Sequence, residues 1–372
     1  MNIPITKIDT TSEDERAVCE VLRSGWLTQG PKVSEFETLF AAYVGAPYAI
    51  ATSSCTTALH LALQVAGVNS DHEVIVPSYS FIATANCVAH RGARTIFADI
   101  DLDTYNLDPK DVERKITPKT KAIIVVHQLG MPADLNAFLE LTKKYELTLI
   151  EDAACAIGAI YRHKKIGSFS DLTCFSLHAR KIITTGEGGM ITSFNPKFVE
   201  QLKCIRSHGM SLSDAERHRS QKILLEEYHA LGFNYRLSDL QAALGISQLH
   251  RIEDIISKRI YLAKRYDDAF KNVAEITTPP VPSFVRHTYQ SYNIRLNQRE
   301  PSFRDKLMQA LASKKIMTRR IMAIHQTPLY AKTCDKLPNT EMAVKNCLLL
   351  PIYPQMTLDE QDYVIDTLLS CL

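Results

Sequence analysis

A lysine stands shortly before a glycine-rich turn in the segment FSLHARKIITTGEGGMI. Lys181 lies five residues before Gly186, and Arg180 directly precedes it. A phosphate-binding P-loop has the opposite order, because its glycines come first and Ser or Thr directly follows its lysine. Here Ile182 follows the lysine, and Glu187 lies among the glycines, where its carboxylate would repel a phosphate. A P-loop is therefore excluded, and Lys181 is either a solvated cation or a covalent catalyst.

Three other segments place reactive or binding residues at the ends of expected strands. Asp152 ends the run LTLIED, and Phe81 follows EVIVPSYS. The segment SSCTTALHLAL puts small hydroxyl side chains before a helix, whose unpaired first N–H groups favour an anion by roughly 0.3 to 2 kcal/mol. Each also has a structural explanation. The acid can cap the next helix, Ser54 or Thr56 can cap their own, and the aromatic ring can belong to the core.

Together these residues match the requirements of one cofactor. Pyridoxal phosphate (PLP) needs a lysine for its Schiff base, a carboxylate at its pyridinium nitrogen, an anion site for its phosphate and a wall for its ring. Lys181, Asp152, the start of the SSCTTA helix and Phe81 would supply these in turn. The acid would keep the ring nitrogen protonated, and the displaced lysine would move the substrate proton as a general base. The combination predicts a PLP site.

Alternating strands and helices in the first two-thirds of the chain would position these residues. Helix-like segments such as TALHLALQVAG, ending in Gly67, and PADLNAFLELTKKYE, with Pro132 at its start, lie between apolar runs. The expected strands are 73–78, 95–100, 122–130, 147–153, 172–177 and 188–193. This alternation predicts an α/β fold with a mostly parallel central sheet and helices on both faces. Ligands bind such sheets beyond the carboxyl ends of the strands.

The sequence pattern changes near residue 250, where we expect a domain boundary. The segment RIEDIISKRIYLAKRYDDAFKNV predicts a long charged helix, and the proline-rich TTPPVPS at 277–283 follows it. The remainder, with YQSYNIRL and FRDKLMQALASKKI, indicates a smaller α+β unit. We therefore predict a large PLP-binding domain at 1–249 and a small C-terminal domain at 250–372, with the long helix as connector.

The composition is that of an ordinary globular protein. Of 372 residues, 45% are hydrophobic and 23% charged, and a net charge of +2 without a long basic block argues against nucleic acid or an acidic membrane as principal partner. The nine cysteines form no C-x-x-C pair, so we expect neither a disulfide framework nor a metal site. The start MNIPITKIDTTSEDERAV is unlike a signal peptide, and no apolar run could span a bilayer. We expect a cytoplasmic protein.

Several ordered motifs are similar to those of the DegT/DnrJ/EryC1/StrS family of PLP-dependent sugar aminotransferases. The resemblance covers almost the whole chain and implies the type I fold of aspartate aminotransferase. It rests on SSCTTALHLAL, VPSYSFIATAN, FADIDLDTYNLDP, VVHQLGMPADL, IEDAACAIGA, FSLHARKIITTGEGGMI, GFNYRLSDLQAALGISQL and LLLPIYPQMT. Ordered motifs at family-like spacing are far more specific than any single motif.

The resemblance implies cofactor roles for particular positions. Lys181 would hold PLP as a Schiff base, Asp152 would pair with the ring nitrogen, and Phe81 would stack on the ring. Three further positions match phosphate-binding residues of the family: Cys55, Thr56 and Ser176. Asn234, in GFNYRLSD, matches an asparagine that reaches the phosphate from the neighbouring subunit. That match implies a homodimer with shared active sites.

Two positions differ from the family pattern. Cys155 stands where the family often has a glutamine that contacts the phenolic oxygen of the cofactor, and a thiol makes only a weak contact there. Cys55 replaces the more common glycine of the phosphate turn, which requires a backbone angle that suits a side chain. Some relatives carry histidine in place of the lysine and act as dehydratases. The presence of Lys181 favours transamination.

The usual reaction of the family moves an amino group from an amino acid, typically glutamate, to a keto-sugar bound to a nucleotide. The kinetics would be ping-pong, and the products typically feed polysaccharide or antibiotic pathways. The segment RRIMAIHQTPLY resembles one that lies near the sugar nucleotide in relatives. We therefore expect substrate contacts from His325, Tyr330 and Arg236, although each can equally be a structural polar residue.

Two other functions stay open from the sequence. One is a PLP-dependent sugar dehydratase or lyase of the same fold, which Lys181 disfavours. The other is a non-catalytic regulatory relative, which would have no physical need for Lys181, Asp152 and Asn234 together. His178 and Arg180 flank the lysine, and we expect them at the entrance of the site.

Overall fold

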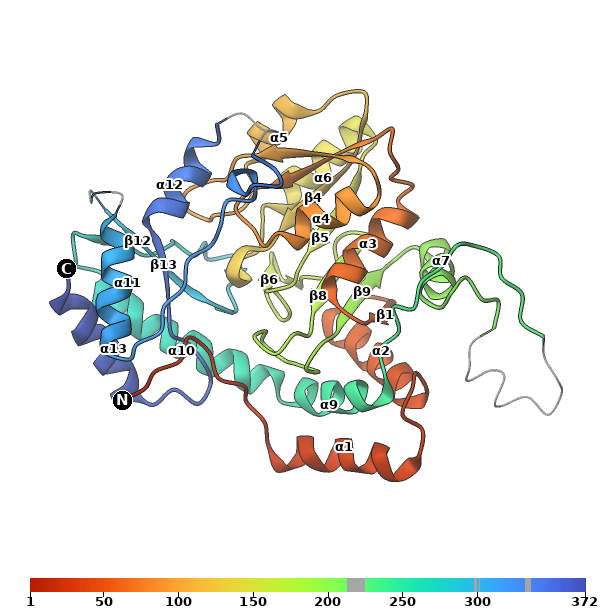
Figure 1. Ribbon diagram of the computed structural model, residues 1–372, viewed down its shortest axis with the longest axis horizontal. Coiled ribbons are helices and arrows are strands. Elements are labelled where there is room, and N and C mark those ends of the chain that lie inside the picture. The colour runs from red at the N-terminus through yellow and green to blue at the C-terminus, as the bar shows by residue number, and fades with distance from the viewer. Residues whose placement is uncertain (213–224, 298–299, 301, 332–335) are drawn as a thin grey trace.

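The computed structural model describes residues 1–212, 225–297, 300, 302–331 and 336–372. At its centre is a seven-stranded sheet with the order β1-β9-β8-β5-β4-β2-β3 (Figure 1). The strands are β1 (Tyr48–Thr52), β2 (Glu73–Pro77), β3 (Arg94–Ala98), β4 (Thr120–Val126), β5 (Thr148–Asp152), β8 (Thr173–Ser176) and β9 (Gly189–Ser193). β9 is antiparallel to both of its neighbours, whereas the other neighbours pair in parallel. The expected mostly parallel sheet is confirmed.

The ends of some elements differ from the sequence-based expectation. The expected strand 122–130 ends at Val126, and a short 3-10 turn, η1 (Gln128–Gly130), follows it. The helix expected from Pro132 begins at Leu135, because the side chain of Asp134 caps its first turn. β1 had no expected counterpart, since its sequence YAIAT is rich in alanine, a residue with low strand propensity.

Helices cover both faces of the sheet, as expected. On one face α2, α5, α6 and α9 share an apolar core with the start of α10, and on the other face α3, α4 and α7 form a second core. Their bounds are α2 (Pro31–Val44), α3 (Cys55–Val65), α4 (Ala83–His90), α5 (Pro109–Lys115), α6 (Leu135–Tyr145), α7 (Pro196–Arg206), α9 (Asp239–His250) and α10 (Ile252–Phe270). A further helix, α1 (Ser12–Ser24), lies along α9 at the outside (Figure 1).

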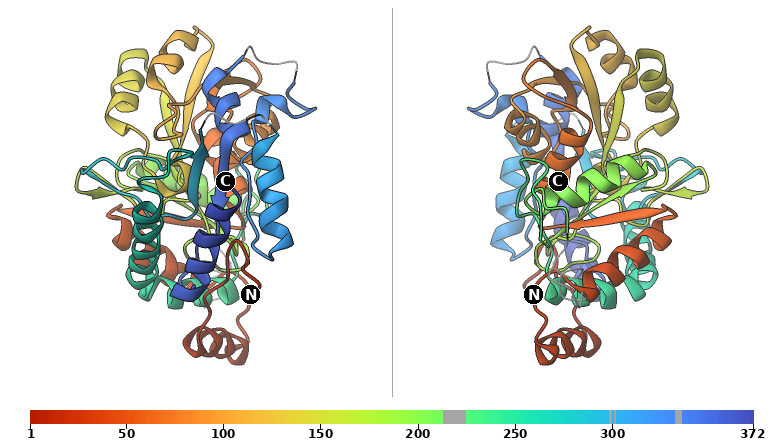
Figure 2. Two further views of the ribbon diagram at one scale, coloured as in Figure 1. Left: turned by 90° about the vertical axis from the view of Figure 1, so that its left-hand side faces the viewer. Right: turned by 90° about the vertical axis from the view of Figure 1, so that its right-hand side faces the viewer.

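The C-terminal part has its own antiparallel sheet, with the order β10-β12-β13. Helices α10, α11 and α13 pack around a separate apolar core beside this sheet (Figure 2). The bounds are β10 (Ile276–Thr277), β12 (Tyr292–Leu296), β13 (Cys347–Leu350), α11 (Phe303–Ser313) and α13 (Leu358–Ser370). The smaller α+β unit expected after the long helix is therefore present.

The two units share elements at their junction. Helix α10 contributes Ile252 to the core of the large unit and Tyr266 to the core of the small one. Near the N-terminus, Ile3 is fully buried in the small unit, where its N–H donates to the carbonyl of Lys315 (2.8 Å). The boundary at 249/250 stays a prediction, but the first residues of the chain pack with the C-terminal unit.

Segments of the C-terminal half also return to the large unit. Helix α12 (Pro338–Asn346) begins on Asp99 at the end of β3, whose Oδ1 accepts hydrogen bonds from the N–H and the hydroxyl of Thr340 (both 2.8 Å). A second three-stranded sheet joins β11 (Val285–Arg286) to the hairpin of β6 (Ile160–Tyr161) and β7 (Lys164–Lys165). These contacts hold the segment around residue 288 against the large unit.

Two sequence-based expectations concern cysteines and membranes. The eight cysteines within the described ranges are all unpaired, and Cys334 lies outside those ranges. None of the described helices is both long and apolar enough to cross a bilayer.

Candidate active site

The candidate catalytic residues lie where β5 and β8 end. These two strands are parallel neighbours, with Asp152 opposite Cys174, so both chains leave the sheet at the same edge. From the end of β8 the chain enters a tight turn, in which the N–H of Lys181 donates to the carbonyl of His178 (2.9 Å). The turn is closed by a hydrogen bond from the N–H of Ala179 to the carbonyl of Gly186. Gly186 has a φ of +81°, a conformation that favours glycine. Here the glycine turns the chain back toward β9.

Lys181 is half-buried and contacts a cysteine of the neighbouring loop. Its Nζ donates to Sγ of Cys155 at 3.2 Å. Burial alone would lower the pKa of Lys181, but the contact with Cys155 and the nearby carboxylate of Asp152 outweigh it, so the pKa is raised above its ordinary value. The sequence-based expectation left the role of Cys155 open. The structure places Sγ of Cys155 against the amine of Lys181.

Asp152 and its neighbour Glu151 are both buried but have opposite pKa shifts. Burial raises the pKa of Asp152, although the hydroxyl of Thr84 (2.9 Å) and the N–H of Ala154 (3.1 Å) donate to its oxygens. Burial would also raise the pKa of Glu151, but His127, at 2.8 Å, holds it below its ordinary value with the help of two hydroxyls. Asp152 therefore still gains from a positive partner, and a protonated ring nitrogen would be one.

An anion site fits at the start of α3. Ser54 caps this helix by accepting a hydrogen bond from the N–H of Thr57, and the helix begins at Cys55. The side chain of Cys55 is buried in the core, and its helical backbone accepts a side chain, so a glycine is not required here. Thr56 follows in the first turn, where helix N–H groups are unpaired. This is the arrangement that a phosphate group needs.

Gly189 brings β9 up to this helix start. A Cβ at Gly189 would lie 2.5 Å from the carbonyl carbon and oxygen of Ser54, so only glycine fits. Gly189 is also the cross-strand neighbour of both Ser176 on β8 and Thr52 on β1. Ser176, buried at the end of β8, therefore lies in the same row as Thr52, at the end of the strand that leads into α3. The predicted phosphate-binding residues of β8 and α3 are brought together, and no pattern in the sequence indicated the part played by Gly189.

Phe81 lies at the open side of the site. Its side chain is 65% exposed, and its carbonyl accepts a hydrogen bond from the N–H of Thr84, the residue that binds Asp152. Thr84 thus links the main chain of Phe81 to the carboxylate, and an exposed aromatic ring can serve as a wall for a planar ligand. Thr84 could not be found from the sequence, because a threonine within a helix carries no signal until the fold brings it to a buried acid.

Asn234 and Arg236 belong to a segment that passes the start of α3. The carbonyl of Tyr235 accepts a hydrogen bond from the N–H of Ser53 (2.8 Å), and the side chain of Asn234 is exposed. Arg236 is half-buried. The structure thus places both residues near the anion site, while their roles stay predictions.

His325 and Tyr330 are buried and bonded within the chain. Nδ1 of His325 lies 2.6 Å from Oγ of Ser78, and burial lowers the pKa of this histidine. The hydroxyl of Tyr330 donates to Asn86 on α4 (2.9 Å). These contacts hold the segment against the large unit, so both side chains have a structural task, and a substrate contact from either stays a prediction. The two residues expected at the entrance, close to Lys181, have different surroundings. Arg180 is exposed, whereas Nε2 of His178 lies 3.7 Å from Oε1 of Glu187.

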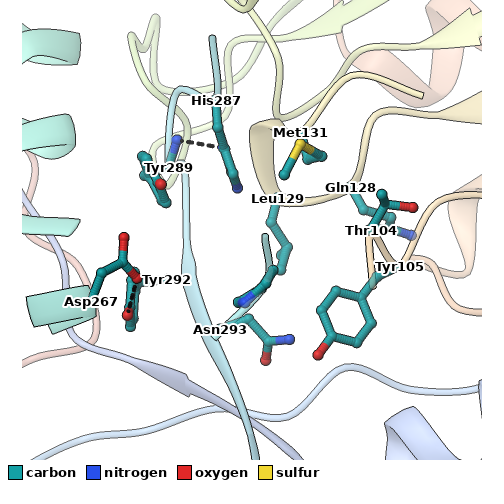
Figure 3. Close-up of a pocket in the computed structure, with 11 residues that line it drawn as sticks. Thr104, Tyr105, Gln128, Leu129, Met131, Asp267, His287, Tyr289, Tyr292 and Asn293 are labelled. Carbon is teal, nitrogen blue, oxygen red and sulfur yellow. Dashed lines mark hydrogen bonds between the residues drawn. The ribbon is translucent and has the colours of Figure 1, made fainter. Parts of the chain in front are cut away.

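A small cavity lies between the two units (Figure 3). Its walls come from η1, from the loop between β3 and α5, from α10, from the segment between β10 and β12, and from the start of β12. The lining residues are Thr104, Tyr105, Gln128, Leu129, Met131, Asp267, Pro279, His287, Tyr289, Tyr292 and Asn293. Burial lowers the pKa of His287 to about 3, so its imidazole is neutral, and it stacks on Tyr289 with ring centroids 4.0 Å apart. The cavity therefore lies at the interface between the large unit and the small unit.

Comparison with known proteins decides the family. The sequence profile of the DegT/DnrJ/EryC1/StrS aminotransferase family matches residues 8–369. The chain belongs to this family. The predicted type I fold and the enzyme class, a PLP-dependent aminotransferase, are thereby confirmed.

Named relatives agree with this assignment. The spore coat polysaccharide biosynthesis protein SpsC of Bacillus subtilis is 38% identical over 361 residues, which cover 95% of this chain and 93% of SpsC. The crystal structure of the aminotransferase TlmJ from Streptoalloteichus hindustanus matches with a TM-score of 0.93 and 31% identity, over 100% and 99% of the two chains. The PLP form of Spr1654, a putative sugar aminotransferase of Streptococcus pneumoniae, matches with a TM-score of 0.92 and 27% identity, over 100% and 98%.

The opposite pKa shifts of the two adjacent carboxyls predict opposite effects on the cofactor-free protein. The folded pKa of Asp152 is raised, so its ionised form costs stability above that pKa, and Asp152→Asn should raise the free energy of unfolding near neutral pH. The folded pKa of Glu151 is lowered, so its ionised form stabilises the fold, and Glu151→Gln should lower that free energy by about 2 kcal/mol.

Urea unfolding of the cofactor-free full chain near pH 7 measures both effects. Adding PLP should stabilise the wild type more than Asp152→Asn, since only the wild type offers a carboxylate to the ring. Destabilisation by both substitutions would contradict the assignment of Asp152 as the acid whose burial outweighs its hydrogen bonds and the nearby charge of Lys181.

Proposed function

We propose that this enzyme transfers an amino group from an amino acid, with glutamate as the expected donor, to a nucleotide-linked keto-sugar. The observation that carries the proposal is the position of Lys181 beside Asp152 and the start of α3. Lys181 would hold PLP covalently, Asp152 would bind its ring nitrogen, and Phe81 would face its ring. The first turn of α3 and Ser176 would bind its phosphate. When bound, PLP withdraws electrons from the substrate carbon that bears the amino group.

The side chains of the protein would move and hold protons around this centre. Asp152 keeps a proton at the ring nitrogen, because its burial makes a positive partner favourable. Nζ of Lys181, freed when a substrate amine takes its place, would act as general base and acid and would move the proton released from the substrate carbon. The tight turn at the end of β8, closed by the N–H of Ala179 on the carbonyl of Gly186, would limit how far Lys181 can move from the site.

The sugar substrate follows from the family and from the relatives named above. SpsC takes part in spore coat polysaccharide biosynthesis, and Spr1654 is described as a putative sugar aminotransferase. Arg180 is exposed beside the lysine, and Arg236 is half-buried near the start of α3. Two cations at the mouth of the site would favour an anionic substrate such as a nucleotide-linked sugar.

A homodimer with shared active sites would complete this arrangement. Phe81 is 65% exposed in the single chain, and Asn234 is exposed next to the anion site. The segment before Asn234 also exposes large apolar side chains, with Leu225 82% and Leu231 88% exposed. A second copy of the chain would cover these residues and could place Asn234 at the phosphate of its partner.

The unpaired cysteines in the described part of the chain support a reducing, cytoplasmic location.

The first prediction concerns covalent attachment. The full-length protein loaded with PLP should show a visible absorbance band, and borohydride should fix the cofactor on Lys181, as seen by peptide mass. Lys181→Ala should lose the band and turnover, whereas Arg180→Ala should keep the band, because its side chain is exposed beside the lysine. A wild type that stays colourless with excess PLP would refute the enzyme assignment.

The second prediction concerns the substrate. The enzyme is first converted to its amino form with glutamate, which removes the visible band. Nucleotide-linked keto-sugars should restore the band and yield an amino-sugar, while the same sugars without a nucleotide should react far more slowly. A deoxygenated sugar product without an added amino group would favour the dehydratase alternative, and no response to any keto-sugar would oppose the proposed substrate class.

The third prediction concerns the shared site. Lys181→Ala and Asn234→Ala subunits should each be inactive or weak alone, and mixing them under mild denaturation and refolding should restore part of the activity. Rescue is expected because half of the mixed dimers' sites would combine an intact lysine with an intact asparagine from the partner. Mixing Lys181→Ala with itself is the control. Absence of rescue would argue against a contact made across the dimer.

A further inference from the structure

Three segments that are far apart in the sequence meet beside the catalytic lysine. They are η1, the loop after β5 that carries Cys155, and residues 287–291 of the small unit. The N–H of Thr288 donates to the carbonyl of Gly130 (3.2 Å), and the N–H of Ser291 donates to Leu129 (3.4 Å). The small unit is thus tied by its main chain to the turn that follows β4.

The meeting point requires a glycine at position 130. Gly130 has a φ of +102°, and a Cβ there would lie 2.4 Å from Oγ1 of Thr288 and 3.2 Å from the carbonyl of Cys155. Because that space is open, the hydroxyl of Thr288 reaches the carbonyl of Cys155 with a long hydrogen bond of 3.4 Å. The VVHQLG motif, which the proposed function does not use, ends at this glycine.

A second side chain from the same segment reaches the loop of the lysine. Nε2 of Gln290 donates to the carbonyl of Arg180, the residue before Lys181, at 2.8 Å. The buried guanidinium of Arg259 on α10 in turn donates to the carbonyls of Tyr289 (3.2 Å) and Gln290 (3.3 Å). The segment therefore has little freedom to move, and it holds the loops of both Cys155 and Lys181.

We propose that Thr288 and Gln290 are positioning residues for the catalytic lysine. By binding the main-chain carbonyls of Cys155 and Arg180, they keep Sγ of Cys155 against Nζ of Lys181, and this contact determines how readily the amine gives up its proton. The proposal rests on the proposed function, since it concerns the lysine to which PLP would be attached.

The physical basis is the competition between the groups that face Nζ. Cys155 lies on the loop after β5, Asp152 at the end of β5, and Cys55 on α3, and all three favour the charged amine, whereas burial opposes it. Arg180, His178 and Glu187 belong to the lysine's own loop. Only the neutral amine can attack the cofactor or accept the substrate proton. A sulfur atom held 3.2 Å from Nζ therefore raises the pH at which the amine of Lys181 loses its proton.

The experiment measures how attachment of PLP depends on pH. Cofactor-free, full-length protein is mixed with PLP between about pH 7 and 10, and growth of the visible band gives a rate at each pH. Cys155→Ala should move the midpoint of this profile to lower pH and speed attachment below the midpoint roughly tenfold, the effect expected for losing one hydrogen bond to a charged group. Thr288→Val and Gln290→Ala should shift the midpoint in the same direction.

Matched variants separate positioning from general damage. Thr288→Ser keeps the hydroxyl and should retain the wild-type midpoint, and Cys155→Ser should lie between wild type and Cys155→Ala. Thr142→Val is the control, because it removes a hydroxyl that donates to the carbonyl of Phe138 on α6. Combining Thr288→Val with Cys155→Ala should shift the midpoint no further than Cys155→Ala alone.

The outcomes separate this inference from the proposed function. If the wild type forms the band but the Cys155, Thr288 and Gln290 variants all keep its midpoint, the positioning role is overturned, even if the variants are less stable. If the wild type forms no band, the proposed function itself fails. Melting temperatures of each cofactor-free variant show whether a changed rate accompanies loss of the fold.

Discussion

The contact between Nζ of Lys181 and Sγ of Cys155, beside the buried carboxylate of Asp152, lies at the centre of the candidate site. An amine and a carboxylate placed close together at the edge of a sheet shift each other's protonation, and burial strengthens the effect. The parallel pairing of β5 with β8 brings both chains to that edge.

Glycines allow the surrounding segments to approach. Gly189 lets β9 pass directly under the start of α3, and Gly130 lets the small unit reach the loop of Cys155. A side chain at either position would separate backbones that must touch, because protein interiors leave no spare volume for a Cβ. The candidate anion site and the contact with the small unit thus depend on the absence of a side chain at Gly189 and Gly130. Asp152 and Glu151 show the same dependence on surroundings, since neighbouring carboxyls on one strand have opposite pKa shifts.

Much of the architecture could be predicted from the sequence. The six expected strands are present because buried parallel strands have a strong apolar signal, whereas the alanine-rich β1 was missed. Lys181, Asp152 and the start of α3 meet at one edge, as the strand ends suggested. The contacts of His325 and Tyr330 were beyond prediction, because which partners a polar side chain finds depends on segments hundreds of residues away.

The sequence by itself determined the fold class, the family and the residues able to carry the chemistry, because local apolar patterns and ordered motifs are written along the chain. Only the tertiary structure decided which groups face Lys181, that Thr84 binds Asp152, and that Thr288 and Gln290 of the small unit hold the loops beside the lysine. Such contacts join residues remote in sequence through distances of a few ångströms. They are set by how strands, turns and helices pack in three dimensions, and no spacing along the chain encodes them.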